Sequence, residues 1–404
     1  MGASLAGGSK DWADYVKKNG YGANPTAKIK INKKDWNSKD IIITNVEVSS
    51  SVGTEASTCF VELKYVCADE NDNHFGKLDF KMPPDFASVK VGTEIEVELG
   101  YGKGSGLKST LSLGSSKEGT VFIGYISAFD IEIDNEGMAT LTVQGMDAKM
   151  WMMANKKTEL KKKKHKYSQI VKDVYNDYSS KLKGKNVKIK SEAKFKADIY
   201  QQNESDYEFL SRISKLTGSM FFIDRGEMNF VSISALKSTK LKIEPHSKIY
   251  NVKMSASVWG IPKSVEFVSI DKKNYKKVIS AKATNSENIG SGKNASSLTK
   301  NINSVNTIKV IDNTLSSVSE AKFLAKSIYN QREINLIELE IKLMGYPPAK
   351  LGTGVKLKGF GNPIDNSYII TGIKHYCDFD KKSYISILSL KTNRVNPQSK
   401  GLPF

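Results

Sequence analysis

The stretch Gln201–Ile223 constrains the fold more than any other part of this sequence, because it contains a start signal and a stop signal for a helix. Ser205 can cap the helix, and Glu208, three residues later, can complete a capping box. Gly218 suits the left-handed backbone position that follows a helix end. The apolar run Met220–Ile223 comes next and is typical of a buried strand. The stretch therefore predicts a short helix that leads directly into a strand.

The body of this helix has one apolar side. Phe209, Leu210, Ile213 and Leu216 recur with the spacing of a helix of period 3.6, so they are expected to face a core. Taken by itself, an ordinary helix–strand turn of a globular domain is the simplest interpretation. A functional interpretation therefore needs support from the rest of the chain.

The length and composition indicate a globular chain of more than one domain. Its 404 residues are enough for two or three domains, and a hydrophobic content of 39% supports real cores. No apolar run approaches the ~20 residues that a membrane-spanning helix needs. The first ten residues lack the basic and apolar regions of a secretory signal. We therefore expect no membrane span and no secretion signal.

The net charge of +18 is carried mainly by lysine and raises the question of nucleic acid or an acidic membrane face as a partner. The lysines are spread along the chain, and arginine, which phosphate-binding proteins favour, is scarce. The only dense basic run is Lys161–Lys164, followed by His165 and Lys166, and we expect it to be a solvated loop or face. The sequence therefore predicts no nucleic-acid recognition.

Cysteine and histidine are too sparse for a disulfide framework or a zinc site. An odd number of cysteines fits a reducing cytoplasm, and the two on the first alternating strands are expected to be small core residues. The histidines lack the close spacing of zinc ligands. We therefore expect no metal and no cofactor. The residues concerned are Cys59, Cys67, Cys377, His74, His165, His246 and His375.

Residues 26–146 predict a first β-barrel domain, after an N-terminal arm at 1–25 whose amphipathic patch Trp12–Val16 is either mobile or docks on a neighbour. Alternating apolar residues mark the strands, and Asp134–Gly137 has the composition of a hairpin turn. The glycine-rich segment Gly100–Gly106 lacks the order of a phosphate-binding loop and is expected to be a hairpin tip. The predicted strands are Lys28–Ile31, Ile41–Val48, Cys59–Val66, Glu94–Leu99, Val121–Ile133 and Ala139–Val143.

Residues 147–225 predict a mostly helical connector. Ile170, Val171, Val174, Tyr175 and Tyr178 form a helical stripe ahead of the stretch described above. This segment separates two regions in which strands are predicted, so we expect it to join two β units.

Residues 226–395 predict a second β-barrel domain, followed by a polar tail at 396–404. Ser317 and Glu320 form a second candidate capping box at the start of a helix. Residues 280–305 lack periodicity, and we expect a long loop or insertion, with disorder as an open alternative. The predicted strands are Asn229–Ile233, Lys240–Ile243, Tyr250–Ala256, Lys263–Ser269, Ile334–Leu343, Val355–Gly359, Ser367–Ile373 and Ser383–Leu390.

The predicted fold class is therefore a β-rich α+β fold, with two antiparallel β-barrel domains joined by a mostly helical connector. No G-x-S-x-G or H-E-x-x-H motif occurs, and no histidine has the neighbourhood of a general base. We expect no enzymatic activity, so the chain should act through its surfaces.

The stretch resembles the segment Q-x-E-S-D-Y/F-x-F-L/I-x-R and the following strand of the phage late control gene D proteins and of the hub part of VgrG proteins. Three weaker similarities occur in the same order as in that family, at Phe122–Ile126 with Gln144–Asp147, at Leu351–Val355 and at Ile369–His375. The resemblance covers about residues 26–392. The residues that carry the central motif are Gln202, Glu204, Ser205, Asp206, Glu208, Phe209, Leu210, Arg212, Ile213, Gly218, Phe221 and Phe222.

What the resemblance implies is a structural baseplate hub. Members of this family have two tube-protein-like β-barrel domains per chain and form homotrimers that link a sixfold tail tube to a threefold central spike. The implied partners are the spike protein, tail tube or tube-initiator proteins, baseplate wedge proteins and a tape measure protein. The implied location is the baseplate of a virion or phage-tail-like particle that assembles in the bacterial cytoplasm.

VgrG chains continue into a spike, whereas this sequence ends at Phe404. We therefore expect a stand-alone hub with a separate spike, as in contractile phage tails, tailocins and related injection particles. A VgrG-like hub of a type VI-type secretion apparatus is the alternative, and a tail-associated cell-wall hydrolase is an alternative of another class.

Overall fold

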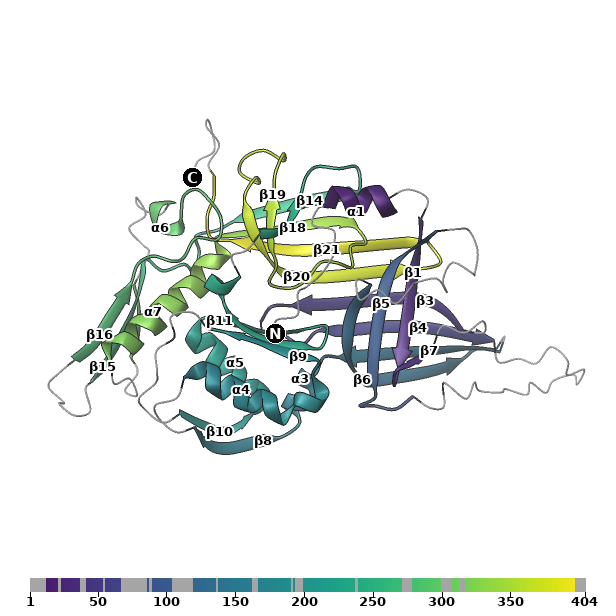
Figure 1. Ribbon diagram of the computed structural model, residues 1–404, viewed down its shortest axis with the longest axis horizontal. Helices are drawn as coiled ribbons and strands as arrows, with labels where there is room; N and C mark the ends of the chain where they lie inside the picture. The colour runs from purple at the N-terminus through teal and green to yellow at the C-terminus, as the bar shows by residue number, and fades with distance from the viewer. Residues whose placement is uncertain are drawn as a thin grey trace, which may run out of the picture.

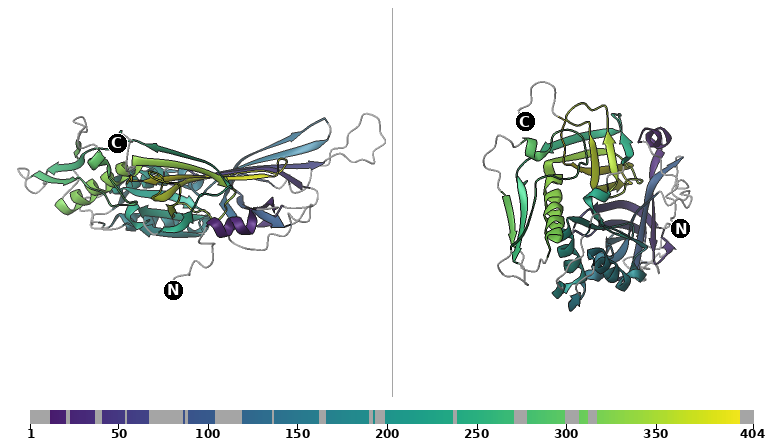
Figure 2. Two further views of the ribbon diagram at one scale, coloured as in Figure 1. Left: turned by 90° about the horizontal axis from the view of Figure 1, so that it is seen from above. Right: turned by 60° about the vertical axis from the view of Figure 1, so that its left-hand side comes forward.

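The computed structural model describes residues 12–20, 23–36, 41–53, 55–66, 86, 89–103, 119–135, 137–161, 166–189, 192, 199–236, 239–270, 278–298, 307–311 and 317–396. These residues form three parts, which we call the N-terminal strand group, the C-terminal strand group and the middle unit (Figure 1). The molecule is elongated, with the N-terminal strand group and part of the middle unit at opposite ends (Figure 2).

The N-terminal strand group is antiparallel, and its strands bury alternate residues, as their period of two predicts. All six strands expected between residues 26 and 146 are present. The hairpin turn after Ile133 is also where the sequence placed it, with Gly137 at a φ of 79°. The group consists of β1 (Ala23–Ile31), β2 (Lys34–Asp35), β3 (Ile41–Ser51), β4 (Thr58–Val66), β5 (Glu94–Lys103), β6 (Thr120–Ile133) and β7 (Met138–Met146).

The C-terminal strand group is mainly antiparallel, and its longest strands β20 and β21 pair as a hairpin, whereas β13 and β19 pair in parallel. The predicted strand Ile334–Leu343 begins three residues later than expected, at Ile337, because Ile334–Leu336 forms a 3-10 turn. The strands are β13 (Thr239–Ile243), β14 (Ile249–Ala256), β18 (Ile337–Met344), β19 (Gly354–Leu357), β20 (Ser367–Asp378) and β21 (Ser383–Thr392).

The two strand groups form one sheet of thirteen strands, in which β20 pairs directly with β3. This antiparallel pairing runs from Gly372–Ser51 to Asp378–Asn45. The predicted β-rich, antiparallel character is confirmed. The sequence predicted that only the connector would join the two β units, whereas in the structure a strand of one unit also pairs with a strand of the other. The division into two barrel domains at residues 146 and 225 stays a prediction.

A register shift of β20 against β21, between Ile370 and Gly372, lies at this junction. Before the shift, Ser367–Ile369 pairs with β19, and from Gly372 onward the strand pairs with β3. Thr371 lies at the shift, and its carbonyl accepts a hydrogen bond from the amide of Val52 (2.8 Å). An extra residue of this kind changes the direction of a strand. Strand β20 accordingly pairs with β19 before Thr371 and with β3 after it.

The middle unit combines helices with three small sheets and has its own apolar core. The predicted connector region contains the strands β8, β9 and β10, which the sequence analysis missed because lysine and polar residues interrupt their apolar alternation. Elements from beyond residue 225 also belong to this unit. Its members are α3 (Lys149–Met153), β8 (Lys156–Lys161), α4 (Tyr167–Asp177), η2 (Ser179–Lys181), β9 (Gly184–Lys188), β10 (Ile199–Ser205), α5 (Asp206–Thr217), β11 (Ser219–Asp224), β12 (Glu227–Ser232), η3 (Ile233–Ala235), β15 (Ser264–Ile270), β16 (Val278–Ala283), α6 (Ala295–Leu298), β17 (Thr307–Ile311), α7 (Val318–Glu333) and η4 (Ile334–Leu336).

The structure gives the Ser317 half of the predicted capping box at the start of α7. The Ser317 hydroxyl accepts a hydrogen bond from the amide of Glu320 (3.3 Å). Ala321, Leu324 and Ala325 are fully buried, so the apolar stripe of this helix faces the core of the middle unit.

The N-terminal arm is helical where the structure describes it. Helix α1 (Trp12–Asn19) buries Trp12 and Val16 in the core of the C-terminal strand group. The ring of Trp12 packs edge-on against Tyr346, with centroids 5.4 Å apart. The expectation of a mobile arm, or one docked on a neighbouring molecule, is wrong for residues 12–20, because their apolar face has a site on the same chain.

The segment expected to be a long loop or a disordered insertion is ordered over residues 278–298. It contains β16 and α6, and the loop between them is fastened to the end of β21 by side-chain and backbone hydrogen bonds. Asn393 accepts from the amide of Ile289 (2.9 Å), and the backbones of Lys293 and Val395 pair. Residues 284–294 are thus a loop, as expected, but the sequence did not show what holds it, because these polar, long-range contacts leave no periodic pattern.

Several predictions lie outside the described residues: the environment of Cys67, the basic run from residue 162 to 165 and the tip of the loop Gly100–Gly106 after Lys103. Within the described part, no helix is long and apolar enough to span a membrane.

Candidate functional site at the junction of the strand groups

The predicted helix in Gln201–Ile223 is α5, and both of its ends have the predicted geometry. The Ser205 hydroxyl accepts from the amide of Glu208 (3.2 Å), and the Glu208 carboxylate accepts from the amide of Ser205 (2.7 Å). These two bonds form the capping box. The Ser205 amide and hydroxyl both donate to the Glu208 carboxylate and hold its pKa below the usual value. Gly218 is left-handed, with a φ of 58°. The helix of the motif is therefore defined by its own sequence.

Replacing Ser205 by alanine is expected to lower the free energy of unfolding by about 1 kcal/mol, because the amide of Glu208 in the first turn of the helix loses its acceptor. Thermal unfolding followed by circular dichroism measures this. Ser205→Asp is the matched control, since aspartate is also a good N-cap residue and should retain most of the stability. Equal losses for both variants would contradict the capping role.

Asp206 follows the cap and is the most extensively bonded carboxylate of the motif. It is 1% exposed and accepts hydrogen bonds from Gln201 (2.9 Å), the Tyr178 hydroxyl (2.8 Å) and Lys157 (2.7 Å). Burial alone would raise its pKa, but the bonds from Lys157, Gln201 and Tyr178 outweigh burial and hold the pKa below its usual value. Asp206 thus stays ionised and connects α5 to α4 and β8.

The glutamine of this network is Gln201, not Gln202, which the motif resemblance had selected. Gln201 is fully buried, whereas Gln202 is exposed on β10. The two residues are adjacent, and successive strand residues point to opposite sides, so a shift of one position in the motif alignment moves the side chain to the other face. Ile199, two residues earlier, is apolar and half-buried on the same side of the strand as Gln201. This alternation could have identified Gln201 as the inward-facing glutamine.

Glu204 and Arg212 form an ion pair on the solvent side of the motif. The guanidinium bonds both oxygens of Glu204 at 2.8 Å and also donates to the carbonyl of Tyr200 (2.6 Å). Because the pair is partly exposed, it orients β10 against α5 more than it stabilises the fold. Glu204, Ser205, Glu208 and Arg212 therefore act within the β10–α5 corner.

Strand β11 lies between two cores. Phe221 belongs to the core of the middle unit, together with Phe209, Leu210 and Ile213 of α5, whereas Phe222 belongs to the core of the C-terminal strand group. Adjacent strand residues point to opposite faces, so the pair Phe221–Phe222 requires a buried surface on both sides. The motif therefore connects the middle unit to the C-terminal strand group through buried apolar contacts.

A buried lysine connects the same strand to the N-terminal strand group. Lys149 is 0% exposed; its ammonium donates to the carbonyls of Gly53 (3.0 Å) and Glu55 (2.5 Å) and lies 4.9 Å from the ring centroid of Phe221. Burial lowers the pKa of Lys149, while nearby Asp147 opposes this effect. The sequence analysis missed Lys149, although a single lysine inside the apolar run Asp147–Met153 was a signal.

Two further hydrogen bonds complete this connection. Asp147, the final residue of the predicted Gln144–Asp147 element, accepts from the amide of Ser57 (2.7 Å), and the Ser57 hydroxyl donates to the carbonyl of Ile223 in β11 (3.1 Å). On the other side, Arg225 follows β11 and donates to the carbonyl of Pro347 (2.7 Å). All three parts of the molecule therefore converge on β11.

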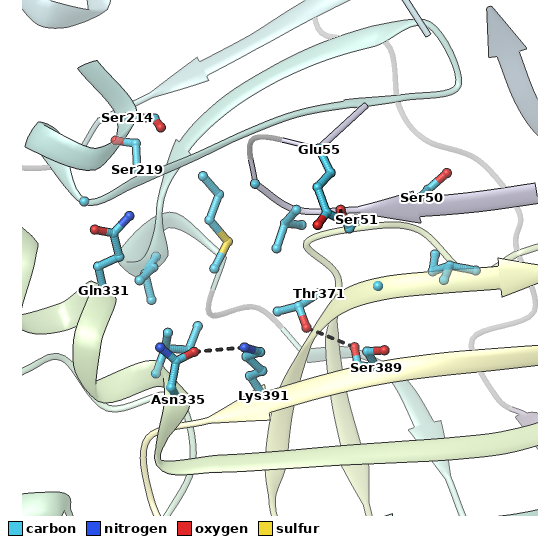
Figure 3. A pocket seen from close by; sticks show the side chains of 18 of the residues that line it. Ser50, Ser51, Glu55, Ser214, Ser219, Gln331, Asn335, Thr371, Ser389 and Lys391 are labelled. Carbon is cyan, nitrogen blue, oxygen red and sulfur yellow. Dashed lines mark hydrogen bonds between the residues drawn. The ribbon is translucent and has the colours of Figure 1, made fainter. Parts of the chain in front are cut away.

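A groove of about 580 Å³, lined by both polar and apolar side chains, lies where these parts meet (Figure 3). One wall is the end of β3 with the β20 shift, and the other comprises the end of α5, the start of β11 and the end of α7. Hydroxyl and amide groups from these elements point into the groove, and two bonds already join them, Thr371 to the carbonyl of Ser389 (3.2 Å) and Lys391 to Asn335 (2.9 Å). The groove can therefore bind a polar ligand.

The buried titratable groups outside this groove are embedded in cores. His375 is 2% exposed, and the Tyr384 hydroxyl and Ser386 Oγ lie 3.0 and 2.9 Å from its Nδ1. Burial, assisted by Arg225, lowers its pKa to about 3, so the ring is uncharged at neutral pH. Burial raises the thiol pKa of Cys59 and Cys377, as expected for small core residues. Among the described residues, no cluster of three or more His, Cys, Asp or Glu side chains is arranged to hold a metal ion.

The family model described as the Alg8 N-terminal domain matches residues 26–378. This is not the late control gene D family that the motif resembles. A comparison with the curated proteins finds no match.

Solved structures of tail proteins share the fold over nearly the whole chain. The prophage MuSo2 43 kDa tail protein from Shewanella oneidensis has a TM-score of 0.61 at 14% identity, covering 92% of this chain and 100% of its own. A tail protein from Neisseria meningitidis MC58 has a TM-score of 0.61 at 12% identity, covering 92% and 97%. The E. coli c3393 protein, a type VI secretion component described as similar to the T4 tail proteins gp27 and gp5, has a TM-score of 0.54 at 11% identity, covering 93% and 78%. These similarities establish a tail-protein fold.

Proposed function

Since this chain belongs to the family of the Alg8 N-terminal domain and has the fold of tail proteins, we propose that it is the structural baseplate hub of a contractile phage tail or phage-tail-like particle. In this role it is a homotrimer that links a sixfold tail tube to a threefold spike. It acts through its surfaces and not as an enzyme, and its location is the baseplate of a particle assembled in the bacterial cytoplasm.

The observation that carries the proposal is the β3–β20 junction. It merges two antiparallel strand groups of one chain into a continuous sheet. Three copies of such a chain present six strand groups around one axis, which matches a sixfold ring on one side and a threefold partner on the other. The spike, tube or tube-initiator, wedge and tape measure proteins are the proposed partners, by the resemblance of the motif to the late control gene D and VgrG hub proteins.

A VgrG-like hub of a type VI-type apparatus is the second candidate, and the similarity to the c3393 protein supports it. The two candidates share the trimeric ring and differ in the particle to which the ring belongs. The proteins encoded beside this chain distinguish them, since a contractile phage tail needs its own sheath, tube and tape measure genes.

We expect the purified protein to be a trimer, either alone or together with the spike protein from the same particle. Light scattering coupled to size exclusion measures the mass directly. The sheet has two ends, β14 and β1–β2, at which another copy can dock, and large interfaces of this kind are typical of permanent assemblies. A monomer under both conditions would overturn the proposal. Clearing of a cell-wall suspension would favour a hydrolase instead.

A further inference from the structure

We propose that the groove at the junction is a binding site for an acidic, extended segment of a partner protein, with carboxylates of that segment paired to Lys215 and Lys374. The identity of the partner as a component of the same particle rests on the proposed hub function. The groove itself is formed within one chain, so the site can be tested independently of assembly.

The charge of the groove is the first argument. Three lysines line it, and Lys391 is already paired with Glu338 (2.6 Å). Lys215 and Lys374 are exposed and have no carboxylate within ion-pair distance in the described part of the chain. The carboxylate that lines the groove, Glu55, accepts from the Ser51 hydroxyl (3.3 Å). Two ammonium groups are therefore left to pair with a ligand.

The end of β3 is the second argument. Its pairing with β4 ends at Ser49–Thr58, whereas its pairing with β20 continues through Ser51. Ser50 and Ser51 therefore continue along β20 without a β4 neighbour, and both line the groove. A strand edge of this kind can hydrogen-bond the backbone of an added extended segment.

The lining favours a peptide over nucleic acid. Ser219 and Gln331 offer a hydroxyl and an amide group, and apolar side chains such as Met220 and Ile334 also line the groove. No lining residue is an aromatic that could stack a base or an arginine that could fork a phosphate. A volume of about 580 Å³ is within the usual range of ligand sites and accommodates a short peptide segment. Hydroxyl donors, two ammonium groups and a strand edge together match an extended chain with acidic side chains.

Fluorescence anisotropy with a labelled oligoglutamate peptide tests the site. The full-length protein is expected to bind this peptide more tightly than an oligoglutamine peptide of the same length. The double variant Lys215→Gln, Lys374→Gln is expected to weaken binding about tenfold, because two charge-assisted contacts are lost. Added salt should reduce binding by the unmodified protein more than binding by the variant.

The matched control is the double variant Lys282→Gln, Lys322→Gln. Both lysines are exposed, on β16 and α7, and lie outside the groove and away from the two sheet ends, so this variant has the same charge change and should retain the affinity. If both double variants weakened peptide binding equally, the peptide would be attracted by the net charge of the protein and not by the groove. That result would overturn the proposed site. Tighter binding of a single-stranded oligonucleotide, lost in the Lys215, Lys374 variant, would assign the groove to nucleic acid and overturn the peptide proposal.

Two measurements on the same samples keep this test separate from the hub proposal. Thermal unfolding of both double variants should match the unmodified protein, because exposed lysines without partners contribute little to stability. Light scattering should give the same mass for all three proteins. Lost peptide binding with an unchanged trimer would reject only the groove proposal, whereas a monomer that binds the peptide would reject only the hub.

Discussion

Replacing Gly218 by alanine is expected to lower the free energy of unfolding by about 2–5 kcal/mol. Part of this loss, about 1–2 kcal/mol, is the cost of a non-glycine residue at a φ of 58°. The rest is steric, because a Cβ added to Gly218 would lie 2.2 Å from the carbonyl oxygen of Ser327 in α7. Separating α5 from α7 disturbs a packed core, which costs a further ~1–3 kcal/mol. Chemical denaturation measures the total.

Gly260→Ala is the matched control for this prediction. Gly260 also has a positive φ, 77°, but nothing lies within 4 Å of the position of its added Cβ. It should therefore show only the backbone part of the loss. Similar losses at the two glycines would mean that the close contact between α5 and α7 has no energetic weight, and the steric argument would be wrong.

Replacing Arg394 by methionine is expected to lower the free energy of unfolding by about 3–5 kcal/mol, because it leaves a buried carboxylate without its cation. Glu333 is 0% exposed and Arg394 is 5% exposed, with 3.2 Å between Nη1 and Oε2. Asn393 and Ser286 also donate to the same carboxylate oxygen, so the pair fastens the ordered loop 284–294 and the end of β21 to α7.

The loss should depend on pH. Burial raises the pKa of Glu333, and Arg394 partly opposes this rise, so removing Arg394 raises the pKa further. A carboxyl group with a raised pKa binds its proton more tightly in the folded state, so stability falls as pH rises from the unfolded value of about 4.3 through the folded value. The difference in melting temperature between the unmodified protein and Arg394→Met should therefore be small below about pH 4 and large at neutral pH.

The double variant Glu333→Gln, Arg394→Met separates charge from packing. A neutral amide removes the unpaired charge and can still hydrogen-bond Asn393 and Ser286, so this variant should recover most of the stability and lose the pH dependence. Lys391→Met, which removes a partly exposed pair with Glu338, should cost under about 1 kcal/mol at any pH near neutrality. A pH-independent loss in Arg394→Met would contradict the assignment of a buried charge.

Elements with local signals were predicted well. The capping box of α5, its left-handed Gly218, the cap of α7 and the hairpin turn before Gly137 all depend on residues within a few positions of one another. The alternating strands were predicted for the same reason, since each strand buries one face of its own sequence. Strands β8 and β9 were missed because they lack a clear apolar alternation of their own. They are strands because they pair with β10 and β12, which lie elsewhere in the sequence.

The candidate site was predictable only in part. The motif pointed to the correct corner of the molecule, but it selected Gln202 instead of the buried Gln201 and gave no sign of Lys149. A buried ammonium that donates to the carbonyls of Gly53 and Glu55 depends on contacts almost a hundred residues away in the chain, which a single sequence does not display. The order of residues 278–298 escaped prediction for the same reason.

The sequence by itself determined that this chain is β-rich, where most of its strands and its two capped helices lie, and that a punctuated helix–strand stretch forms the centre of the motif. The tertiary structure alone decided that Phe221 and Phe222 face two different cores, that β20 leaves β19 for β3 at Thr371, and that a groove forms beside that junction. The physical reason is the separation along the chain between the residues that interact. Caps, turns and alternation arise from neighbours along the chain, whereas strand partners and shared cores depend on which distant surfaces bury one another.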